Sequence, residues 1–557
     1  MSVALLQAAG DLLDTVAEVH ADEPDVLAAV EGWRQRLREP LRLGIAGMVK
    51  AGKSTLLNAL IGERIAPTDA GECTRVVTWY RYGATPQVVA VGRDGARTPL
   101  ALQRRDQRLE FDLRGLEADD LDHIDVRWPS PSLRSLVLID TPGIESVSER
   151  VSGRSLTFLT PGRGGPTEAD AIVYLLRHLH PSDLSFLQAF RDSAAGDGNS
   201  VNALAVLSRA DEVGGGRLDA LLSARGIAAR YRENPDLRAL ALTVIPVAGL
   251  IAESARTLRE QEFTVLREIA GWDRDVRDRL LRSADRFVRE GASHIDAGQR
   301  AELLDRFGIT GIRLGVALVR GGARTSSRLA EQLVVQSGLE ELRGTVRRLF
   351  RSRSAALKVR ALLDHADALV RDRPRPDSEA LVEQIERLRD GAHELRELDL
   401  LARARIDGFG LAPGQAVEAE RILGADGTDA ADRLGLPPDA SVGQQAARTD
   451  ALLGQWRQRA GAPGASRAEV RVCGVIVRTL EGLASEIGTA GGGRTAADVD
   501  PSPRPASRRR EQRYEQRERQ QARVGEDQDP QRQRRVVAAE ELEPDDAHDA
   551  EGHQRSA

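Results

Sequence analysis

The sequence predicts an α/β domain, then an all-α helical bundle, then a disordered tail. Short apolar runs alternate with helical stretches over the first 250 residues or so, which is typical of a mainly parallel sheet with helices on both faces. Long helical periodicity begins near residue 337, with apolar residues on one face and arginines on the other. After residue 491 the chain is too poor in apolar residues to offset the entropy of ordering.

Two helices are predicted before the α/β domain, because apolar residues recur at helical spacing on both sides of Asp22-Glu23-Pro24. Strand-like runs lie at 41–46, 76–81, 88–91, 122–127, 136–139, 171–176, 203–207 and 242–247. Helical stretches then cover 357–370, 380–401, 446–456 and 468–487, with Gly, Pro and Asp breaks at 408–415 and 424–440. We expect these helices to form an antiparallel bundle.

A phosphate-binding loop follows the first strand. The pattern G-x-x-x-x-G-K-[S/T] is matched by Gly47-Met48-Val49-Lys50-Ala51-Gly52-Lys53-Ser54, and a helical run from Thr55 to Ile61 comes next. The glycines allow main-chain N–H groups to surround a polyphosphate, Lys53 places a charge on its β and γ oxygens, and the Ser54 hydroxyl ligates Mg²⁺. The expected nucleotide-binding residues here are Gly47, Val49, Lys50, Ala51, Gly52, Lys53, Ser54 and Thr55.

Lysine usage supports this interpretation. The chain has 79 basic residues but only three lysines, and two of them, Lys50 and Lys53, lie in the loop. A wide, planar guanidinium cannot replace a compact ammonium inside a tight main-chain cradle. A chain that otherwise prefers arginine therefore keeps lysine where the chemistry excludes the exchange.

A second motif, Asp140-Thr141-Pro142-Gly143, ends the apolar strand at 136–139. A carboxylate at this place can hold the Mg²⁺ shell, usually through water, and the Gly143 N–H can meet the γ-phosphate. Thr74 lies between the two motifs and can offer its hydroxyl and carbonyl to Mg²⁺ when a triphosphate is bound; an ordinary loop residue is the alternative. The expected metal ligands are Ser54, Thr74 and Asp140.

The base-reading element is expected after the strand at 203–207, in Ser208-Arg209-Ala210-Asp211. The Asp211 carboxylate can accept from guanine N1–H and N2–H₂ together, which adenine cannot match. Arg209 would lie over the base, a position more often given to lysine. Ser208, Arg209 and Asp211 are therefore expected to select GTP, bound with Mg²⁺.

Composition excludes several other classes. The net charge of −6 argues against a surface-wide nucleic-acid footprint, so no DNA partner is expected. Cys73 and Cys473 form neither a disulfide framework nor a zinc-ligand spacing, which favours the cytoplasm. No window approaches the roughly 18 apolar residues of a membrane span, so any membrane contact should be peripheral. The run 311–320 mixes apolar residues with arginines as an interfacial segment does, but a buried helix or strand explains it better.

In order, Gly47–Ser54, Thr74, Asp140–Gly143 and Ser208–Asp211 match the motifs of GTPases, and with helices on either side the chain resembles the dynamin family. Residues 46–60 and 63–74 look like the bacterial dynamin-like proteins of actinobacteria, including the isoniazid-inducible ones. The passage from Ser337 to Arg353 is similar to the point where such G domains enter their neck helix.

The resemblance covers about residues 1–490 and implies neck helices over 1–40, a G domain over 41–350 and a helical neck and trunk over 351–490. Residues 491–557 are the disordered tail that their composition predicts. It also implies GTP hydrolysis to GDP and phosphate. The G domains would pair as a homodimer or with a paralogue, and the helical part would bind or remodel membrane lipid at the periphery.

Two departures from the family pattern concern catalysis. Eukaryotic dynamins carry a catalytic Gln and a cation-holding Ser at the loop positions occupied here by Val49 and Lys50, and Ile144 cannot orient water as the Gln of Ras-like proteins does. Slow intrinsic hydrolysis is therefore expected. Lys50, with Lys53 and Thr74, is the candidate catalytic set, Lys50 supplying the missing positive charge in its own site or across a dimer. A solvent-facing Lys50 without a catalytic role is the other interpretation.

Two other functions remain open. A ribosome- or RNA-associated GTPase would need a basic face on its helical part and salt-sensitive RNA binding. A GTP-binding assembly protein with little turnover would fit Val49 and Ile144.

Overall fold

The computed structural model describes residues 2–67, 76–105, 108–111, 113, 115–143, 168–193, 201–217, 219–289 and 295–492. Residues 1–488 form one compact unit. Thr74, Ile144 and the predicted disordered tail from residue 493 onward lie outside the described residues.

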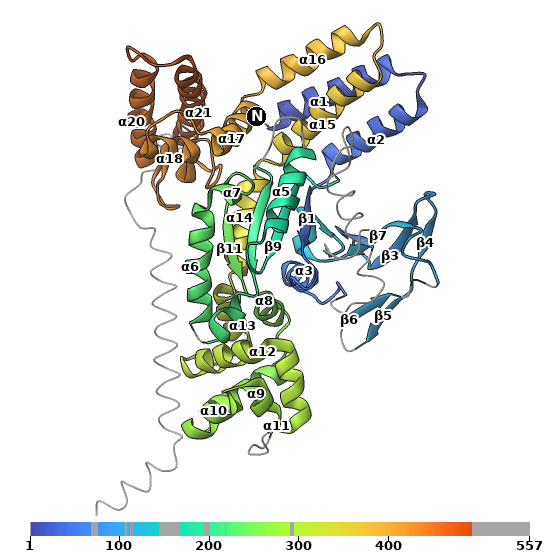
Figure 1. The fold of residues 1–557 in the computed structure, drawn as a ribbon, viewed down its shortest axis with the longest axis vertical. Helices are drawn as coiled ribbons and strands as arrows, with labels where there is room; N and C mark the ends of the chain where they lie inside the picture. The colour runs from blue at the N-terminus through green and yellow to red at the C-terminus, as the bar shows by residue number, and fades with distance from the viewer. Residues whose placement is uncertain are drawn as a thin grey trace, which may run out of the picture. The chain divides into compact units, whose positions relative to one another are not determined.

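A nine-stranded sheet in the order β11-β10-β9-β1-β8-β2-β7-β3-β4 lies at the centre of the nucleotide-binding domain (Figure 1). Its strands are β1 Leu41–Gly47, β2 Val77–Tyr82, β3 Gln87–Gly92, β4 Arg97–Pro99, β7 Leu121–Trp128, β8 Leu136–Asp140, β9 Ala171–Leu176, β10 Ala203–Ser208 and β11 Val244–Val247. Strands β11, β10, β9, β1 and β8 are parallel. The predicted α/β class is confirmed, because each predicted strand is present with ends shifted by at most two residues.

The far edge of the sheet differs from a purely parallel arrangement. Strand β2 pairs antiparallel with β8 and parallel with β7, while β3 pairs antiparallel with both β7 and β4. Beyond β4, a separate hairpin of β5 (Leu102–Arg105) and β6 (Arg108–Phe111) was not predicted. This edge lies away from the strand ends that carry the phosphate-loop and base-reading motifs.

Alternating side chains place an apolar core on each face of the sheet. On β9, Val173 and Leu175 belong to the core that includes α3 (Lys53–Ile61) and α14 (Leu339–Val346). Ile172, Tyr174 and Leu176 point the other way, into the core that includes α5 (Pro181–Ser193) and α6 (Ala220–Glu233). Each fully buried aliphatic side chain contributes about 1.5–3 kcal/mol, so the two cores fix the register of the strands.

Helices precede and follow the sheet, as predicted. The remaining ones are α1 Ser2–Val19, α2 Pro24–Arg38, α7 Pro235–Arg238, α8 Gly249–Arg256, α9 Glu260–Gly271, α10 Arg274–Leu280, α11 Ala284–Arg289, α12 Ala297–Arg320, α13 Ser326–Gln336, α15 Ser354–Asp372, α16 Ser378–Gly391, α17 His393–Asp407, α18 Pro413–Ile422, α19 Ala430–Leu434, α20 Val442–Ala460 and α21 Arg467–Gly492. Helices α1, α2, α15 and α16 pack on one another. We call these four helices the neck bundle.

The mixed apolar and arginine run at 311–320 lies in α12. A Cβ added at Gly311 would be 3.2 Å from Ile251 Cγ1, and one added at Gly315 would be 3.3 Å from Leu266 Cδ1. The small residues therefore let α12 approach α8 and α9 closely, which agrees with a buried helix. In the part of the chain that the structure describes, no helix combines the length and apolar character needed to cross a bilayer.

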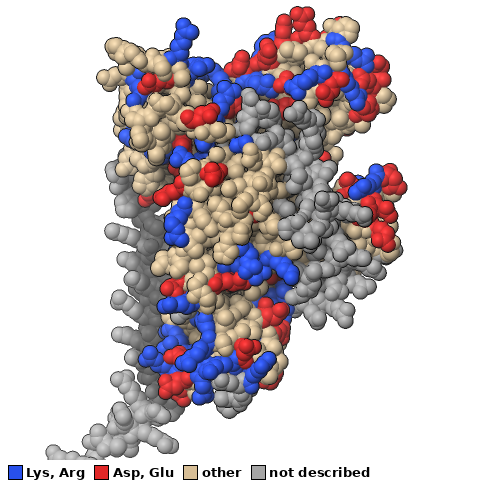
Figure 2. Space-filling model, in the orientation of Figure 1, with Lys and Arg blue, Asp and Glu red and all other residues tan. Residues whose placement is uncertain are grey.

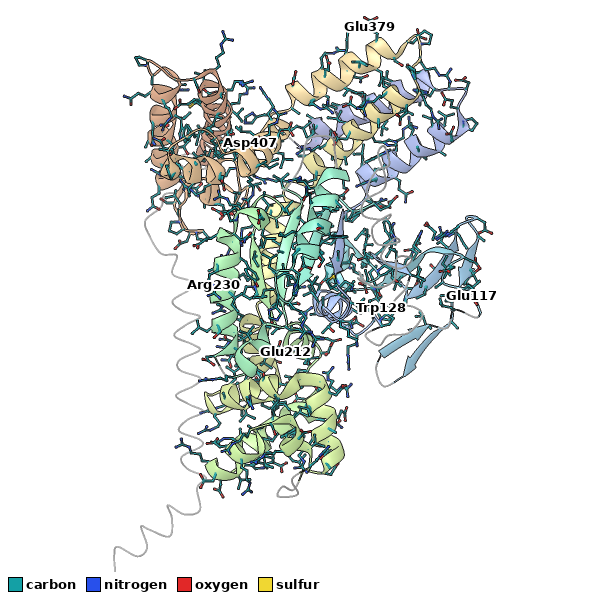
Figure 3. The ribbon with its side chains drawn as sticks, in the orientation of Figure 1. Glu117, Trp128, Glu212, Arg230, Glu379 and Asp407 are labelled. Atoms are coloured by element: carbon teal, nitrogen blue, oxygen red, sulfur yellow. The ribbon has the colours of Figure 1, made fainter. Side chains whose placement is uncertain are left out.

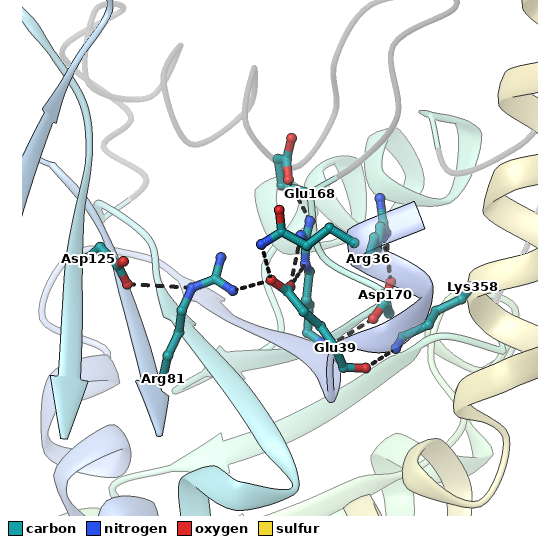
Figure 4. A network of polar contacts seen from close by, with 9 residues as sticks. Arg36, Glu39, Arg81, Asp125, Glu168, Asp170 and Lys358 are labelled. Carbon is teal, nitrogen blue, oxygen red and sulfur yellow. Dashed lines mark hydrogen bonds and ion pairs between the residues drawn. The ribbon is translucent and has the colours of Figure 1, made fainter. Parts of the chain in front are cut away.

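A buried polar network joins the neck bundle to the sheet (Figure 4). Asp170, just before β9, accepts hydrogen bonds from Arg36 Nε of α2 at 2.9 Å and from the Arg42 main-chain N–H at 2.8 Å. Glu39, between α2 and β1, accepts from Arg81 of β2 at 2.7 Å. Its main-chain oxygen accepts from Lys358 of α15. The third lysine of the chain is thus a buried structural contact.

We predict that Asp170→Asn lowers stability by about 3 kcal/mol, because removing one charge from a buried ion pair leaves the other uncompensated. The Arg36 and Asp170 side chains are 4% and 0% exposed. Asp14→Asn is the control, since its pair with Arg34 is 65% and 32% exposed and should contribute at most about 1 kcal/mol. Urea unfolding measures both; equal losses would contradict the structural role of the network.

Asp364 on α15 is a half-buried acid in the neck bundle, with 26% of its side chain exposed. Burial raises its pKa to about 7, against the opposing effect of Arg360 and Arg389. Arg389 NH2 lies 3.5 Å from Asp364 Oδ1, and Oδ2 has no hydrogen-bond partner among the described residues. Between the ordinary pKa of 3.8 and the raised pKa of about 7, the folded protein therefore binds a proton at Asp364 that the unfolded chain would release.

From this raised pKa we predict that Asp364→Asn gains stability relative to wild type as the pH rises from 5 to 8. A raised folded-state pKa gives a contribution that is fully present below the ordinary value of 3.8 and is lost as the pH rises through about 7. Asparagine does not titrate and avoids that loss. Thermal melts of both proteins across this range test it, and parallel curves would contradict it.

Candidate functional site

The motifs predicted from the sequence meet at one edge of the sheet. Because β1, β8, β10 and β11 are parallel, their carboxyl ends lie together. The phosphate loop follows β1, Asp140 ends β8, and Ser208 ends β10. This edge therefore carries the candidate site.

The phosphate loop takes main-chain conformations that its glycines permit. Gly47 has φ 147°, and a Cβ there would lie 2.5 Å from the Leu175 carbonyl oxygen, so no side chain fits. Gly52, with φ 95°, caps α3, which begins at Lys53, two residues before the predicted start. The N-terminus of α3 faces the loop with unpaired N–H groups and a partial positive charge, which favours an anion.

Lys53 is folded over its own loop. Its side chain is largely buried, and its Nζ donates to the carbonyl oxygens of Gly47 at 3.2 Å and Met48 at 3.3 Å. Burial lowers the pKa of Lys53, against the opposing effect of Asp140. A Cβ added at Gly143 would be 3.2 Å from Nζ, so Gly143 borders the same space. The ammonium is thus placed next to both motifs.

Ser54 and Asp140 form a pair of oxygen donors. Ser54 Oγ donates to Asp140 Oδ2 at 3.0 Å. Burial raises the pKa of Asp140 to about 6, although Lys53 and the Ser54 hydrogen bond oppose the shift. The other oxygen, Oδ1, is buried and has no hydrogen-bond partner among the described residues. Hard oxygen donors with one unsatisfied position fit Mg²⁺, which keeps waters and phosphate oxygens as its other ligands.

A cavity of about 160 Å³ lies beside the loop, between Ala51, Gly52 and Thr55 on one side and Ser208 to Asp211 on the other. Asp211 is buried, and burial raises its pKa. Ser208 Oγ donates to the Leu176 carbonyl oxygen at 3.1 Å, which fixes the end of β10 to β9. The cavity thus joins the predicted phosphate and base elements.

Arg209 links the base loop to the phosphate loop. Its NH1 donates to Glu212 Oε1 at 2.7 Å and its NH2 to the Lys50 carbonyl oxygen at 3.0 Å. Glu212, labelled in Figure 3, also accepts from Arg177 at 3.1 Å. Arg209 (φ 51°) and Lys50 (φ 61°) are the non-glycine residues with left-handed backbone in the described chain. The two strained positions therefore support each other.

Val49 and Lys50 lie on the open side of the loop. Val49 is 39% exposed, and a Cβ added at Gly143 would approach its Cγ2 to 2.5 Å. The Lys50 side chain is exposed as well. The ammonium of Lys50 is therefore free to reach a bound phosphate or a second molecule.

The cavity residues that the sequence analysis did not assign to the site include Val247, Gly249 and Leu250. Val247 ends β11, and α8 begins at Gly249. The first N–H groups of a helix lack partners inside it, so this turn presents donors to the cavity. The sequence analysis predicted the strand at 242–247. In a parallel sheet the carboxyl end of that strand lies at the same edge as the phosphate loop, and this could have indicated that the following turn belongs to the site.

Residues 71–75, which include Thr74, lie outside the described residues. The segment that precedes them along the chain is described up to residue 67, and hydrogen bonds hold it in place. Asn58 of α3 uses its amide fully. Its Oδ1 accepts from the N–H groups of Ile65 at 3.0 Å and Ala66 at 2.7 Å, and its Nδ2 donates to the Ala66 carbonyl at 3.1 Å and to Glu253 at 2.9 Å. The chain is thus held firmly up to Ala66.

Comparisons with known proteins indicate the family of this chain. Residues 43–187 match the model of the family described as Dynamin family. The chain is 39% identical to isoniazid-induced protein IniC of Mycobacterium tuberculosis over 472 residues, 84% of this chain and 95% of IniC. It is 32% identical to IniA of that organism over 29% of this chain and 26% of IniA. It is 28% identical to a bacterial dynamin-like protein of Nostoc punctiforme over 35% of this chain and 28% of that protein.

Solved structures are less similar. A structure described as an oligomerised bacterial dynamin pair for long-range sensing and tethering of membranes covers 72% of this chain and 79% of its own, with 15% identity and a TM-score of 0.27. The G domain of the T. maritima FeoB iron transporter covers 38% and 89%, with 14% identity and a TM-score of 0.18. At these scores, neither likeness supports a conclusion about this chain.

The phosphate loop, the D-x-x-G turn and the base loop on one edge of an α/β sheet define a P-loop GTPase. Its similarity to IniC over most of both chains shows the family: this chain belongs to the dynamin family, as a bacterial dynamin-like GTPase. The predicted resemblance and enzyme class are confirmed.

Proposed function

We propose that this protein hydrolyses GTP to GDP and phosphate with Mg²⁺, and couples this cycle to pairing of G domains and to peripheral membrane binding or remodelling. One observation carries the proposal. Lys53, the Ser54–Asp140 pair and the Asp211-lined cavity lie together at the carboxyl edge of the parallel strands.

The phosphate loop binds the triphosphate through main-chain N–H groups at the start of α3. Lys53 exchanges its contacts with two carbonyl oxygens for the stronger contact with phosphate oxygens. Ser54 and Asp140, together with Thr74, would hold Mg²⁺. When bound, the ion neutralises charge on the β and γ oxygens.

The cavity reads the base from two sides. Asp211 accepts from guanine N1–H and N2–H₂, while the first N–H groups of α8, at Gly249 and Leu250, donate to guanine O6. Adenine presents an amine where guanine presents O6, and it has no N2 amine. It would leave both the carboxylate and the N–H groups unpaired.

Hydrolysis by a single molecule should be slow, because Val49 packs toward Gly143 where a polar side chain would be needed to orient water. We propose that the exposed Lys50 supplies positive charge to the phosphates in its own site or across a G-domain pair. A point charge is enough for this role. Negative charge develops on the phosphate oxygens in the transition state, and a nearby cation stabilises it.

Lys50→Gly tests this role more cleanly than alanine does. Glycine keeps φ 61° without strain and keeps the carbonyl oxygen that Arg209 contacts, so the main-chain geometry is retained while the side chain with its ammonium is lost. We predict that single-turnover GTP hydrolysis falls at least about tenfold in Lys50→Gly, the size of a lost charge contact, and recovers in part in Lys50→Arg. An unchanged turnover number in Lys50→Gly would leave Lys50 without a catalytic role.

Membership of the dynamin family supports the membrane part of the proposal. Figure 2 bears on the RNA-associated alternative, which needs a basic face on the helical part. On the face shown, acidic and basic side chains of the described residues are interspersed. The membrane role is preferred because the chain belongs to the dynamin family. The assembly protein with little turnover is the second alternative, and Val49 favours it.

Single-turnover hydrolysis with anionic liposomes or with RNA separates these functions. We predict faster phosphate release with liposomes, no effect of RNA, and loss of activity in Lys53→Ala under all conditions. RNA stimulation would instead favour the RNA-associated GTPase. Tight GTP binding without phosphate release under any condition would favour the assembly protein.

A further inference from the structure

Helix α14 begins directly behind the base cavity. The Ala248 main-chain N–H donates to the Ser337 carbonyl oxygen at 2.9 Å. Ala248 lies between Val247 and Gly249, which both line the cavity. A single main-chain hydrogen bond thus connects the cavity wall to the turn that precedes α14.

Gly338 makes this contact unusually close. It has φ +81°, and an added Cβ would lie 2.2 Å from the Pro246 carbonyl oxygen and 3.6 Å from Val247 Cα. Both neighbours are main-chain atoms of β11, which is held by β10 and cannot yield as a flexible side chain does. Any residue larger than glycine must displace the end of β11, and with it the start of α8.

The turn that carries Gly338 is itself fixed. Ser337 is fully buried, its Oγ donates to the Val334 carbonyl oxygen at 2.7 Å, and it accepts from the Leu339 N–H at 3.3 Å. On the other side, Leu339 and Leu342 are fully buried in the core. The turn therefore moves only together with α14.

Helix α14 leads into the neck bundle through a short connection. A π-helical turn at Arg347–Arg351 follows it directly, two turn residues come next, and α15 begins at Ser354. The Arg353 N–H donates to the Phe350 carbonyl oxygen at 3.1 Å, and the Arg353 carbonyl oxygen accepts from the Leu357 N–H at 3.0 Å. A displacement of the cavity wall is consequently passed to the neck bundle through a short, hydrogen-bonded connection.

We propose that Ser337 and Gly338 are positioning residues of the base cavity, holding the Val247–Leu250 turn in place so that base binding and the position of α14 are coupled. This inference rests on the proposed function, in which the cavity takes guanine. The coupling is reciprocal: whatever shifts α14 changes affinity for the base, and binding of the base restrains α14.

The test compares Gly338→Ala with Gly95→Ala. Gly95 has the same φ of +81° with nothing within 4 Å of an added Cβ, so it carries the backbone strain without the contact. Affinities for GTP and for Mg²⁺-tripolyphosphate, which has no base, are measured by calorimetry on the full chain. We expect GTP affinity at least about tenfold weaker in Gly338→Ala than in Gly95→Ala, because displaced N–H groups lose their bonds to the base. Tripolyphosphate affinity should be equal in both.

Equal GTP affinity in the two variants would overturn the inference, and so would parallel losses for GTP and tripolyphosphate, which indicate a general structural defect. Equal affinity of the wild-type protein for GTP and ATP would instead refute the proposed function itself. If Gly338→Ala does not fold, amide hydrogen exchange of wild type decides the matter. GDP, but not tripolyphosphate, should protect the Ala248 amide and residues 339–346, and equal protection by both would overturn the inference.

Discussion

The site depends on one geometric constraint, that parallel strands end at the same edge of their sheet. Strands β1, β8, β10 and β11 each leave the sheet at this edge. Segments far apart in sequence are thereby brought within hydrogen-bonding distance, as in the contact from Arg209 to the Lys50 carbonyl. The two buried cores keep the strands in register, and the Asp170 network extends that order to the neck.

The same edge concentrates costly polar groups and strained backbone. Among the described residues Asp140 has a buried oxygen without a hydrogen-bond partner, Lys53 is buried against carbonyl oxygens, and Lys50 and Arg209 hold left-handed backbones. Each strained or unpaired position costs about 1–3 kcal/mol. A polyanion with a divalent cation would satisfy the Asp140 oxygen and the Lys53 ammonium together, which is why such groups gather at nucleotide sites.

Much of the fold followed from the sequence, because strands and helices differ in the period of their apolar residues. The phosphate loop and Asp140 were also within reach, since their motifs are local. The turn after β11 was missed because it carries no motif; its role comes from where β11 lies in the sheet. The buried role of Lys358, which contacts Glu39, and the close approach of Gly338 to Pro246 depend on packing between segments far apart in sequence. No local pattern reports such contacts.

The central claim is that the phosphate loop, Asp211 and the start of α8 form one pocket for a guanine triphosphate. Calorimetry of GTP and ATP with Mg²⁺ on wild type and on Asp211→Asn tests it most directly. The account predicts that wild type binds GTP far more tightly than ATP, and that the substitution removes most of this difference while affinity for ATP is retained. Equal affinity of wild type for the two nucleotides, or binding of neither, would contradict it.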